Sequence, residues 1–342
     1  MSDALRLSAA IATYGHTKTL KSKQEQPTGC ELDFVEVEPI IAAFRRMVRT
    51  LEFDVCELAP TTYLAARDAD IPVTALPIFL MRRFHHGDMV CRPGSGISAP
   101  KDLEGRKVGV RAYTVSTGVW ARGILQHEYG VDPDSITWVV DDEEHVTSYQ
   151  LPPNVVSTEP GQSIAGLFHE GGIDAALTGP AGIGRSGAPT AGWAIAGAGF
   201  DEARKPSEDY YPLFPGAREI ETAWYHRTGI YPIHGLVVVK TEILDANPWL
   251  AQSLVDAFTA SKQPFLESLR AGIDDTKEFA SYSSLRKIVG DDPLPYGIGP
   301  NEKSINALID YSVDQHIVAR RYEIDEIFTS NSWLALHDPN PL

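Results

Sequence analysis

The segment Met81–Asp88 carries a dense group of side chains that can bind and protonate a small anion. Arginine offers a planar fork of donors for a carboxylate, and histidine titrates near neutral pH. The sequence therefore predicts that an arginine of this segment, Arg82 or Arg83, clamps a carboxylate and that a histidine, His85 or His86, delivers a proton. The alternative is a solvated loop with incidental charge. In an extended segment, His85 and His86 point to opposite sides, so only one would reach a shared site.

A second group of candidate anion ligands lies where a predicted strand turns into a helix. There, backbone N–H groups, hydroxyl groups and the positive end of the helix dipole can cradle a carboxylate. Ser116 or Thr117 would alternatively cap the helix, and the two roles can coincide. The predicted substrate-binding residues of this group are Arg111, Thr114, Ser116 and Thr117.

Polar side chains also follow two predicted parallel strands near the start of the chain. Tyr14 and His16 come after the first strand, and Glu57 ends a buried one. Because ligands of open parallel sheets bind beyond the carboxyl ends of strands, these residues are predicted to face a cleft. Tyr14 would bind substrate and His16 would act as an acid or base, or simply complete a turn. Glu57 would polarise a hydroxyl group, or form a salt bridge within its lobe.

Two further residues are candidate substrate ligands. Thr178 ends the predicted strand Asp174–Thr178 and would donate a hydrogen bond, or cap the turn that follows. His234 lies beside Tyr231 in a strand that returns to the first lobe, where a structural role is the alternative.

Short β-rich runs alternate with longer runs of helical period, which is typical of parallel βαβ units. The sequence predicts two lobes with a cleft between them: residues 1–91 and 235–342 form the first, and residues 92–234 the second. The glycine- and alanine-rich segment 182–199 is predicted to be a mobile loop. The predicted strands are 5–12, 31–37, 53–58, 73–79, 107–111, 136–140, 174–178 and 230–240, and the predicted helices include 39–51, 116–129, 163–170, 247–269 and 301–319.

Composition narrows the classes of partner. The chain has 342 residues, enough for two packed domains, and its formal net charge of −16 disfavours nucleic acid and anionic membranes. The three cysteines are widely spaced, which predicts a reducing compartment, and we expect the cytoplasm. The sequence shows no export signal and no long apolar run. Phosphate-binding, dinucleotide-binding and hydrolase motifs are absent, and neither a metal site nor an organic cofactor is predicted.

Three stretches together resemble the type II periplasmic-binding-protein superfamily: FDVCELAPTTYLAARDADIPVTALPIF, KDLEGRKVGVRAYTVSTGVWARGIL and VVVKTEILDANPWLAQSLVDAF. The resemblance implies an α/β fold of two lobes. Each lobe would have a central, mostly parallel sheet flanked by helices, and a two-strand hinge would join them.

Within that superfamily the chain is similar to the 4,5-dihydroxyphthalate decarboxylase family. The likeness rests on YGHTKTL, RRFHHGDMV, VGVRAYTVSTGVWARGILQHEYGVDPDSITWV and YGIGPNEKSINALIDYSVDQHIVARRYEIDEIF. The family's Arg-x-Phe-x-His pattern falls on Arg82 and His86, and the resemblance implies that Arg82 clamps a carboxylate and that His86 delivers a proton. The resemblance implies a decarboxylase of a hydroxylated aromatic acid that releases CO2 and protonates the ring carbon, with a role in the breakdown of aromatic compounds such as phthalates.

Other functions remain open at the level of sequence. A non-catalytic solute-binding protein for an aromatic carboxylate or related small anion is the main alternative. Enzymes on the same scaffold that make menaquinone or thiamine-pyrimidine precursors are a third class, because a fold does not specify chemistry. The expected partner is a small aromatic carboxylate, and assembly into a homo-oligomer stays open.

Overall fold

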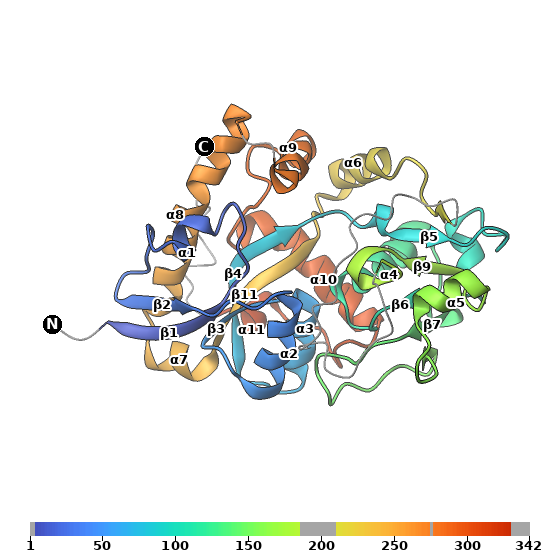
Figure 1. The fold of residues 1–342 in the computed structure, drawn as a ribbon, viewed down its shortest axis with the longest axis horizontal. Coiled ribbons are helices and arrows are strands. Elements are labelled where there is room, and N and C mark those ends of the chain that lie inside the picture. The colour runs from blue at the N-terminus through green and yellow to red at the C-terminus, as the bar shows by residue number, and fades with distance from the viewer. Residues whose placement is uncertain (1–3, 185–209, 274–275, 330–342) are drawn as a thin grey trace. The chain divides into compact units, whose positions relative to one another are not determined.

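The computed structural model of the chain describes residues 4–184, 210–273 and 276–329 (Figure 1). Its contacts divide the chain into two compact units, and each unit contains its own sheet. Unit 1 comprises Met1–Arg83, Thr228–Asn306 and Tyr322–Leu342, and unit 2 comprises Phe84–Arg227 and Ala307–Arg321. The changes of lobe predicted from the sequence lie at 91/92 and 234/235, and these boundaries stay predictions.

Unit 1 is built on a five-stranded sheet with the strand order β2-β1-β3-β11-β4 (Figure 1). Strand β1 pairs in parallel with β2 and β3, whereas β11 runs antiparallel between β3 and β4. All four residues of β3 are buried, as expected of a strand covered on both faces. The strands are β1 (Leu5–Ala10), β2 (Cys30–Phe34), β3 (Val55–Leu58), β4 (Val73–Arg82) and β11 (Ile233–Lys240).

The helices of unit 1 bury this sheet. α2 packs against β3, α3 against β4 and β11, and α8 against α1, α9 and β4. The 22-residue α8 thereby brings a late part of the chain beside the turn that follows β1. The helices are α1 (Lys18–Lys21), α2 (Ile41–Thr50), α3 (Pro60–Asp68), α7 (Thr241–Ala246), α8 (Leu250–Ala271), α9 (Lys277–Val289) and α11 (Ile324–Ile327).

Unit 2 has a six-stranded mixed sheet with the order β10-β5-β9-β6-β7-β8. Strands β9, β6, β7 and β8 pair in parallel, whereas β5 is antiparallel to both β9 and β10. The strands are β5 (Met89–Cys91), β6 (Lys107–Val110), β7 (Thr137–Val140), β8 (Val155–Ser157), β9 (Ala175–Leu177) and β10 (Tyr211–Pro212).

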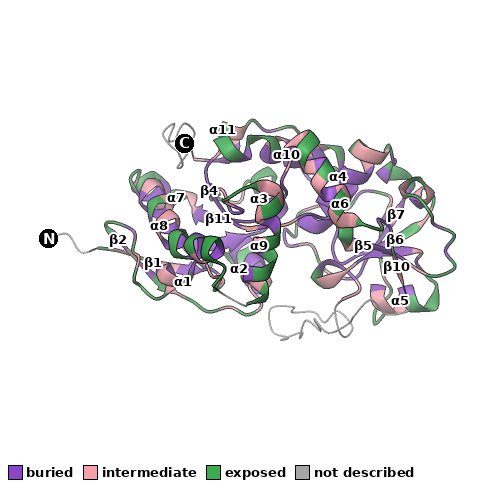
Figure 2. Cartoon of the chain, turned by 90° about the horizontal axis from the view of Figure 1, so that it is seen from above, coloured by how far each residue is buried: buried purple, intermediate pink, exposed green. Residues whose placement is uncertain are grey.

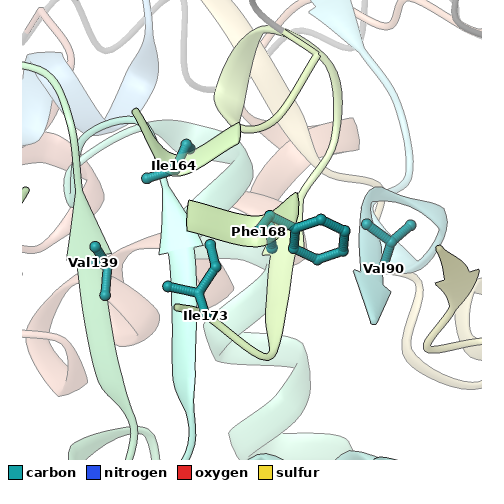
Figure 3. Packing of buried hydrophobic residues seen from close by; sticks show 6 residues of the cluster. Val90, Val139, Ile164, Phe168 and Ile173 are labelled. Carbon is teal, nitrogen blue, oxygen red and sulfur yellow. The ribbon is translucent and has the colours of Figure 1, made fainter. Parts of the chain in front are cut away.

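Helix α5 seals one part of the unit 2 core. Ile164 and Phe168 of this helix pack with Val139 of β7, Val90 of β5 and Ile173, which precedes β9 (Figure 3). Figure 2 shows the strands as largely buried. The helices are α4 (Ser116–Tyr129), α5 (Ile164–Glu170) and α6 (Ala217–Thr228), and α10 (Glu302–Asp314) is shared between the two units. Short 3-10 helices lie at His86–Asp88, Pro100–Leu103, Pro133–Ser135, Gly179–Ala181 and Gly299–Asn301.

The parallel strands predicted from the sequence are confirmed in both sheets. Each sheet also contains antiparallel pairs, formed by β11 in unit 1 and by β5 with β9 and β10 in unit 2, so both sheets are mixed. Residues 185–199 of the predicted mobile loop lie outside the described residues. In the described part of the chain, no helix is long and apolar enough to cross a membrane.

Close packing of α4 on α10 gives a direct test of the unit 2 core. A Cβ atom added at Gly123 of α4 would lie 2.0 Å from Cδ2 of Tyr311. We expect Gly123→Ala to lower the free energy of unfolding by about 1–3 kcal/mol, because the buried ring must shift to relieve the overlap. Urea denaturation followed by circular dichroism measures this change.

The matched control is Gly166→Ala in α5, where the nearest atom to an added Cβ is the Ser163 Oγ at 3.4 Å. This substitution should be neutral or stabilise the protein by up to about 1 kcal/mol, because alanine favours the helix. Equal losses at the two positions would contradict the packing described for Gly123.

Candidate functional site

A compact group of polar and aromatic side chains lies in unit 1 at the carboxyl ends of β1 and β3. The Tyr14 cluster is defined here as Tyr14, His16, Glu57, Phe265, Glu278 and Tyr282. The first two residues follow β1, Glu57 lies in β3, and the last three come from α8 and α9 (Figure 1). Because β1 and β3 are parallel neighbours, their carboxyl ends bring Tyr14 and Glu57 together.

The turn after β1 is closed by Thr17. The Thr17 hydroxyl donates to the Ala12 carbonyl at 2.9 Å, and the Tyr14 N–H donates to the Thr17 Oγ1 at 2.9 Å. Glycine is required at position 15, because an added Cβ would lie 2.5 Å from the ring of Phe265. The turn therefore holds Tyr14 and His16 in fixed positions against α8.

Tyr14 and Glu57 form the central contact of the cluster. The Tyr14 hydroxyl donates to Oε1 of Glu57 at 2.7 Å, and Oε2 of Glu57 accepts the Ala12 N–H at 3.2 Å. Glu57 is buried, whereas Tyr14 is partly exposed. Of the pair, only Tyr14 therefore has exposed surface.

Burial sets the protonation state of the pair. Desolvation raises the pKa of Glu57 to about 7, against the opposing effect of hydrogen bonds from Tyr14 and the Ala12 N–H. Burial, reinforced by the Glu57 carboxylate, raises the pKa of the Tyr14 phenol well above its usual value. Near neutral pH, Glu57 can therefore hold or release a proton while Tyr14 stays protonated.

His16 lies behind Tyr14 and is completely buried. Its ring is parallel to that of Tyr14, with the centroids 5.1 Å apart and an interplanar angle of 2°. Phe265 and Tyr282 lie at 5.8 and 6.4 Å from its centroid. Neither ring nitrogen makes a hydrogen bond within the described part of the chain, and the Nδ1 atom lies 3.6 Å from Oε1 of Glu278.

Arg82, the predicted carboxylate clamp, ends β4 and is buried in unit 1. Its guanidinium donates to the carbonyls of Tyr231 and Pro232 and to Oδ1 of Asn301, and it lies 4.3 Å from the centroid of the Tyr231 ring. These partners hold Arg82 against the backbone of its own unit.

His234, the predicted ligand on β11, is partly exposed. The next residue along the strand, Gly235, packs on Glu57, and an added Cβ there would lie 3.2 Å from Oε1 of the carboxyl group. His234 therefore precedes, in β11, the glycine that packs on Glu57 of the Tyr14 cluster.

His85 and His86, predicted beside Arg82, both lie in unit 2 and are both buried. Nδ1 of His85 is 2.7 Å from Oδ2 of Asp88. His86 sits edge-on to Phe214 and Trp224, with centroids 5.5 and 5.3 Å away. Desolvation lowers the pKa of His86 to about 4, so its imidazole is neutral at pH 7.

The predicted anion ligands before α4 are engaged by carboxylates of the chain itself. A guanidinium nitrogen of Arg111 lies 2.9 Å from Oδ2 of Asp142, and both side chains are buried. Oε2 of Glu144 accepts the N–H and the hydroxyl of Thr114, while its Oε1 accepts the N–H of Tyr113 at 2.5 Å. This part of unit 2 therefore already holds two carboxylates.

The other predicted ligands of unit 2 are hydroxyl residues. Ser116 and Thr117 begin α4 and are buried, and the N-cap position is taken by Val115. The Thr178 N–H donates to the Asp88 carbonyl at 2.8 Å. Their roles as substrate ligands stay predictions.

Sequence reasoning missed Phe265, Glu278 and Tyr282. Glu278 and Tyr282 are four residues apart and share a face of α9, a spacing visible in the sequence. Nothing in that spacing showed that this face meets the turn after β1. Within residues 4–184, 210–273 and 276–329, no group of three His, Cys, Asp or Glu side chains is arranged to hold a metal ion.

Two curated proteins are similar to this chain. The 4,5-dihydroxyphthalate decarboxylase of Comamonas testosteroni is 30% identical over 337 residues, which is 95% of this chain and 96% of the relative. This chain belongs to the 4,5-dihydroxyphthalate decarboxylase family. The protein of the same name from Pseudomonas putida is 29% identical over 181 residues, which is 51% of this chain and 70% of that protein.

The fold of this decarboxylase-family chain is also shared more widely. A family model described as NMT1/THI5 like matches residues 29–151. The crystal structure of the periplasmic aliphatic sulphonate binding protein from Escherichia coli has a TM-score of 0.53 at 14% identity, covering 97% of this chain and 99% of that one. The chain therefore has the periplasmic-binding-protein fold predicted from its sequence.

The buried carboxyl of this family member makes a testable contribution to stability. A carboxyl group with a raised pKa in the folded state stabilises the protein at low pH and loses that contribution as the pH rises through the folded value. For Glu57 the loss should run from its usual 4.5 to about 7. Glu57→Gln removes this titration. The unfolding free energy of the variant minus that of wild type should therefore rise between pH 4.5 and about 7, by at most about 1.4 kcal/mol per pH unit.

Denaturant titrations of both proteins at a series of pH values measure this difference. Glu242→Gln, at an exposed position in the first turn of α7, provides the baseline. A difference between Glu57→Gln and wild type that does not change with pH would contradict the burial of an ionisable Glu57.

Proposed function

We propose that the protein is a carboxy-lyase that decarboxylates 4,5-dihydroxyphthalate or a closely related hydroxylated aromatic acid. The observation that carries this proposal is the match of 30% identity to a 4,5-dihydroxyphthalate decarboxylase along almost the whole of both chains. The Tyr14 cluster supports it, because it contains a buried carboxyl group, a phenol bonded to that carboxyl and an imidazole ring stacked on the phenol.

We propose that Tyr14 and Glu57 supply the proton that replaces the departing carboxylate. A protonated Glu57 can donate to the Tyr14 oxygen through the same 2.7 Å contact, since Oε2 already accepts the Ala12 N–H. The hydrogen of the Tyr14 hydroxyl is then released from Glu57 and can point to a substrate. General acids positioned in this way accelerate proton transfer by about 10²–10⁴-fold.

The proposed step is balanced without a further reactant. The Tyr14 hydroxyl proton moves to the ring carbon that bears the carboxylate, and the Glu57 proton moves to the Tyr14 oxygen. The bond between the ring and the carboxylate then breaks, its electron pair returns to the ring, and CO2 leaves. Glu57 is left as a carboxylate and regains its proton from water.

His86 and His16 are the other proposed proton donors. Burial lowers the pKa of His86 to about 4, so its imidazole is neutral at pH 7 and very little of the protonated form is present to act as an acid. His16 is completely buried behind Tyr14. Both facts favour Tyr14 as the group that meets the substrate, with Glu57 as its proton source.

For the carboxylate groups of the substrate, we propose the donors around the start of α4: Arg111, Thr114, Ser116 and Thr117. Asp142 and Glu144 engage Arg111 and Thr114 in this structure, and both partners are carboxylates. These donors are therefore chemically suited to the same group on a ligand. Arg82, Thr178 and His234 are further proposed ligands.

We also propose that the enzyme works in the reducing environment of the cytoplasm. Its three cysteines, Cys30, Cys56 and Cys91, are all buried as free thiols. Burial raises the pKa of Cys30 to about 11 and that of Cys91 to about 12, so these thiols are not reactive nucleophiles.

Incubation of the purified protein with 4,5-dihydroxyphthalate, followed by CO2 release and ring absorbance, tests the function. Wild type should turn the compound over. Tyr14→Phe should lower kcat by about 10²-fold or more, because it removes the hydroxyl that carries the proton.

The control is Tyr322→Phe, which removes another phenol of unit 1 that donates to a carboxylate, Asp68, at 3.0 Å. This variant should keep wild-type kcat. Tight binding of hydroxylated benzoates and phthalates without turnover would select a solute-binding protein instead, and an active Tyr14→Phe would remove Tyr14 from the reaction.

A further inference from the structure

Glu278 connects α9 to the turn that carries Tyr14 and His16, although 263 residues separate it from Gly15. Its Oε2 accepts the Gly15 N–H at 2.9 Å, and its Oε1 lies 3.6 Å from Nδ1 of His16. The side chain of Glu278 is 31% exposed, whereas that of His16 is fully buried. One carboxylate thus fixes the backbone of the turn and faces its buried imidazole.

The groups around His16 come from several elements. Tyr14 stacks on it from the same turn, with Glu57 of β3 bonded to the Tyr14 hydroxyl. Tyr282 of α9 meets the imidazole edge-on. Lys262 of α8 is paired with Asp292 at 2.6 Å.

The charges on these groups act on His16 in opposite directions. Burial lowers the pKa of His16, and Lys262 lowers it further. Glu278 raises that pKa, through its contact with the ring and its charge. Glu278 is therefore the carboxylate that favours a positive His16.

We propose that Glu278 is a positioning residue for the reaction, whose carboxylate anchors the Tyr14 turn through the Gly15 N–H and faces the His16 imidazole behind the Tyr14 ring. This inference rests on the proposed role of Tyr14 as proton donor. As Tyr14 gives up its proton, negative charge develops on its oxygen. Burial lowers the pKa of His16 overall, so only a fraction of His16 is cationic at neutral pH. That fraction lies parallel to the Tyr14 ring and stabilises the developing charge.

A purely structural role for Glu278 is distinguishable. An acidic residue in the first turn of a helix interacts favourably with the helix dipole, and Glu278 is in the first turn of α9. Glu278→Gln keeps an oxygen that can accept the Gly15 N–H but removes the charge that faces His16. Glu278→Ala removes both.

We expect Glu278→Gln to lower kcat about tenfold and to leave KM within about twofold of wild type. This is the effect of lowering the pKa of His16 by about one unit, which reduces its cationic fraction about tenfold. NMR titration of the imidazole signals, with His16→Gln used to assign that of His16, should show a lower pKa of His16 in Glu278→Gln. Glu278→Ala should lose at least as much kcat and should also melt at a lower temperature.

Glu242→Gln, which changes a first-turn glutamate of α7, should alter neither kcat nor the titration of His16. An active wild type with unchanged kcat and unchanged His16 titration in Glu278→Gln overturns this inference alone. A wild type that releases no CO2 from hydroxylated aromatic acids overturns the proposed function and, with it, this inference.

Discussion

The burial of the Glu57 carboxyl group beneath Tyr14 is the constraint on which the account depends. A carboxyl at the end of a fully buried strand has lost most of its hydration, and the two donors that reach it, Tyr14 and the Ala12 N–H, offset only part of that loss. The pKa of the group therefore lies near 7. The same burial that makes this residue costly to the fold gives the protein a proton that it can exchange at neutral pH.

The rest of unit 1 maintains this arrangement. Thr17 closes the turn that presents Tyr14, and Gly15 lets that turn lie against the Phe265 ring of α8. Gly235 of β11 leaves room for the carboxyl group of Glu57. The contacts of Gly15 and Gly235 join segments that are far apart in the chain, so the cluster forms only when β1, β3, β11 and α8 are all in place.

Much of the fold could be predicted from the sequence. Apolar runs of strand length alternating with helical periods predicted the parallel strands, and α4 begins and ends where its pattern indicated, at Ser116 and Tyr129. The resemblance to binding proteins predicted the fold class, which the likeness to a solved binding protein confirms. The antiparallel pairing of β5 with β9 was not predicted, because a three-residue strand carries too little periodicity to show its direction.

The candidate site could be predicted only in part. Tyr14, His16 and Glu57 were found because the carboxyl ends of parallel strands share an edge, and the structure brings the three together. Glu278 was missed because it is an ordinary first-turn glutamate in sequence, and its partner lies 263 positions away. For Arg82 and Arg111, charge was visible in the sequence, but their present partners, the carbonyl of Tyr231 and the carboxylate of Asp142, depend on tertiary packing.

The pH dependence of kcat for CO2 release by the wild-type protein tests the central claim most directly. If Glu57 must be protonated to supply the proton through Tyr14, kcat measured from about pH 5 to about pH 9 should be highest in acid and should fall as the pH rises through about 7. A kcat that is flat across this range, or that increases with pH, would contradict the role given to the buried carboxyl group.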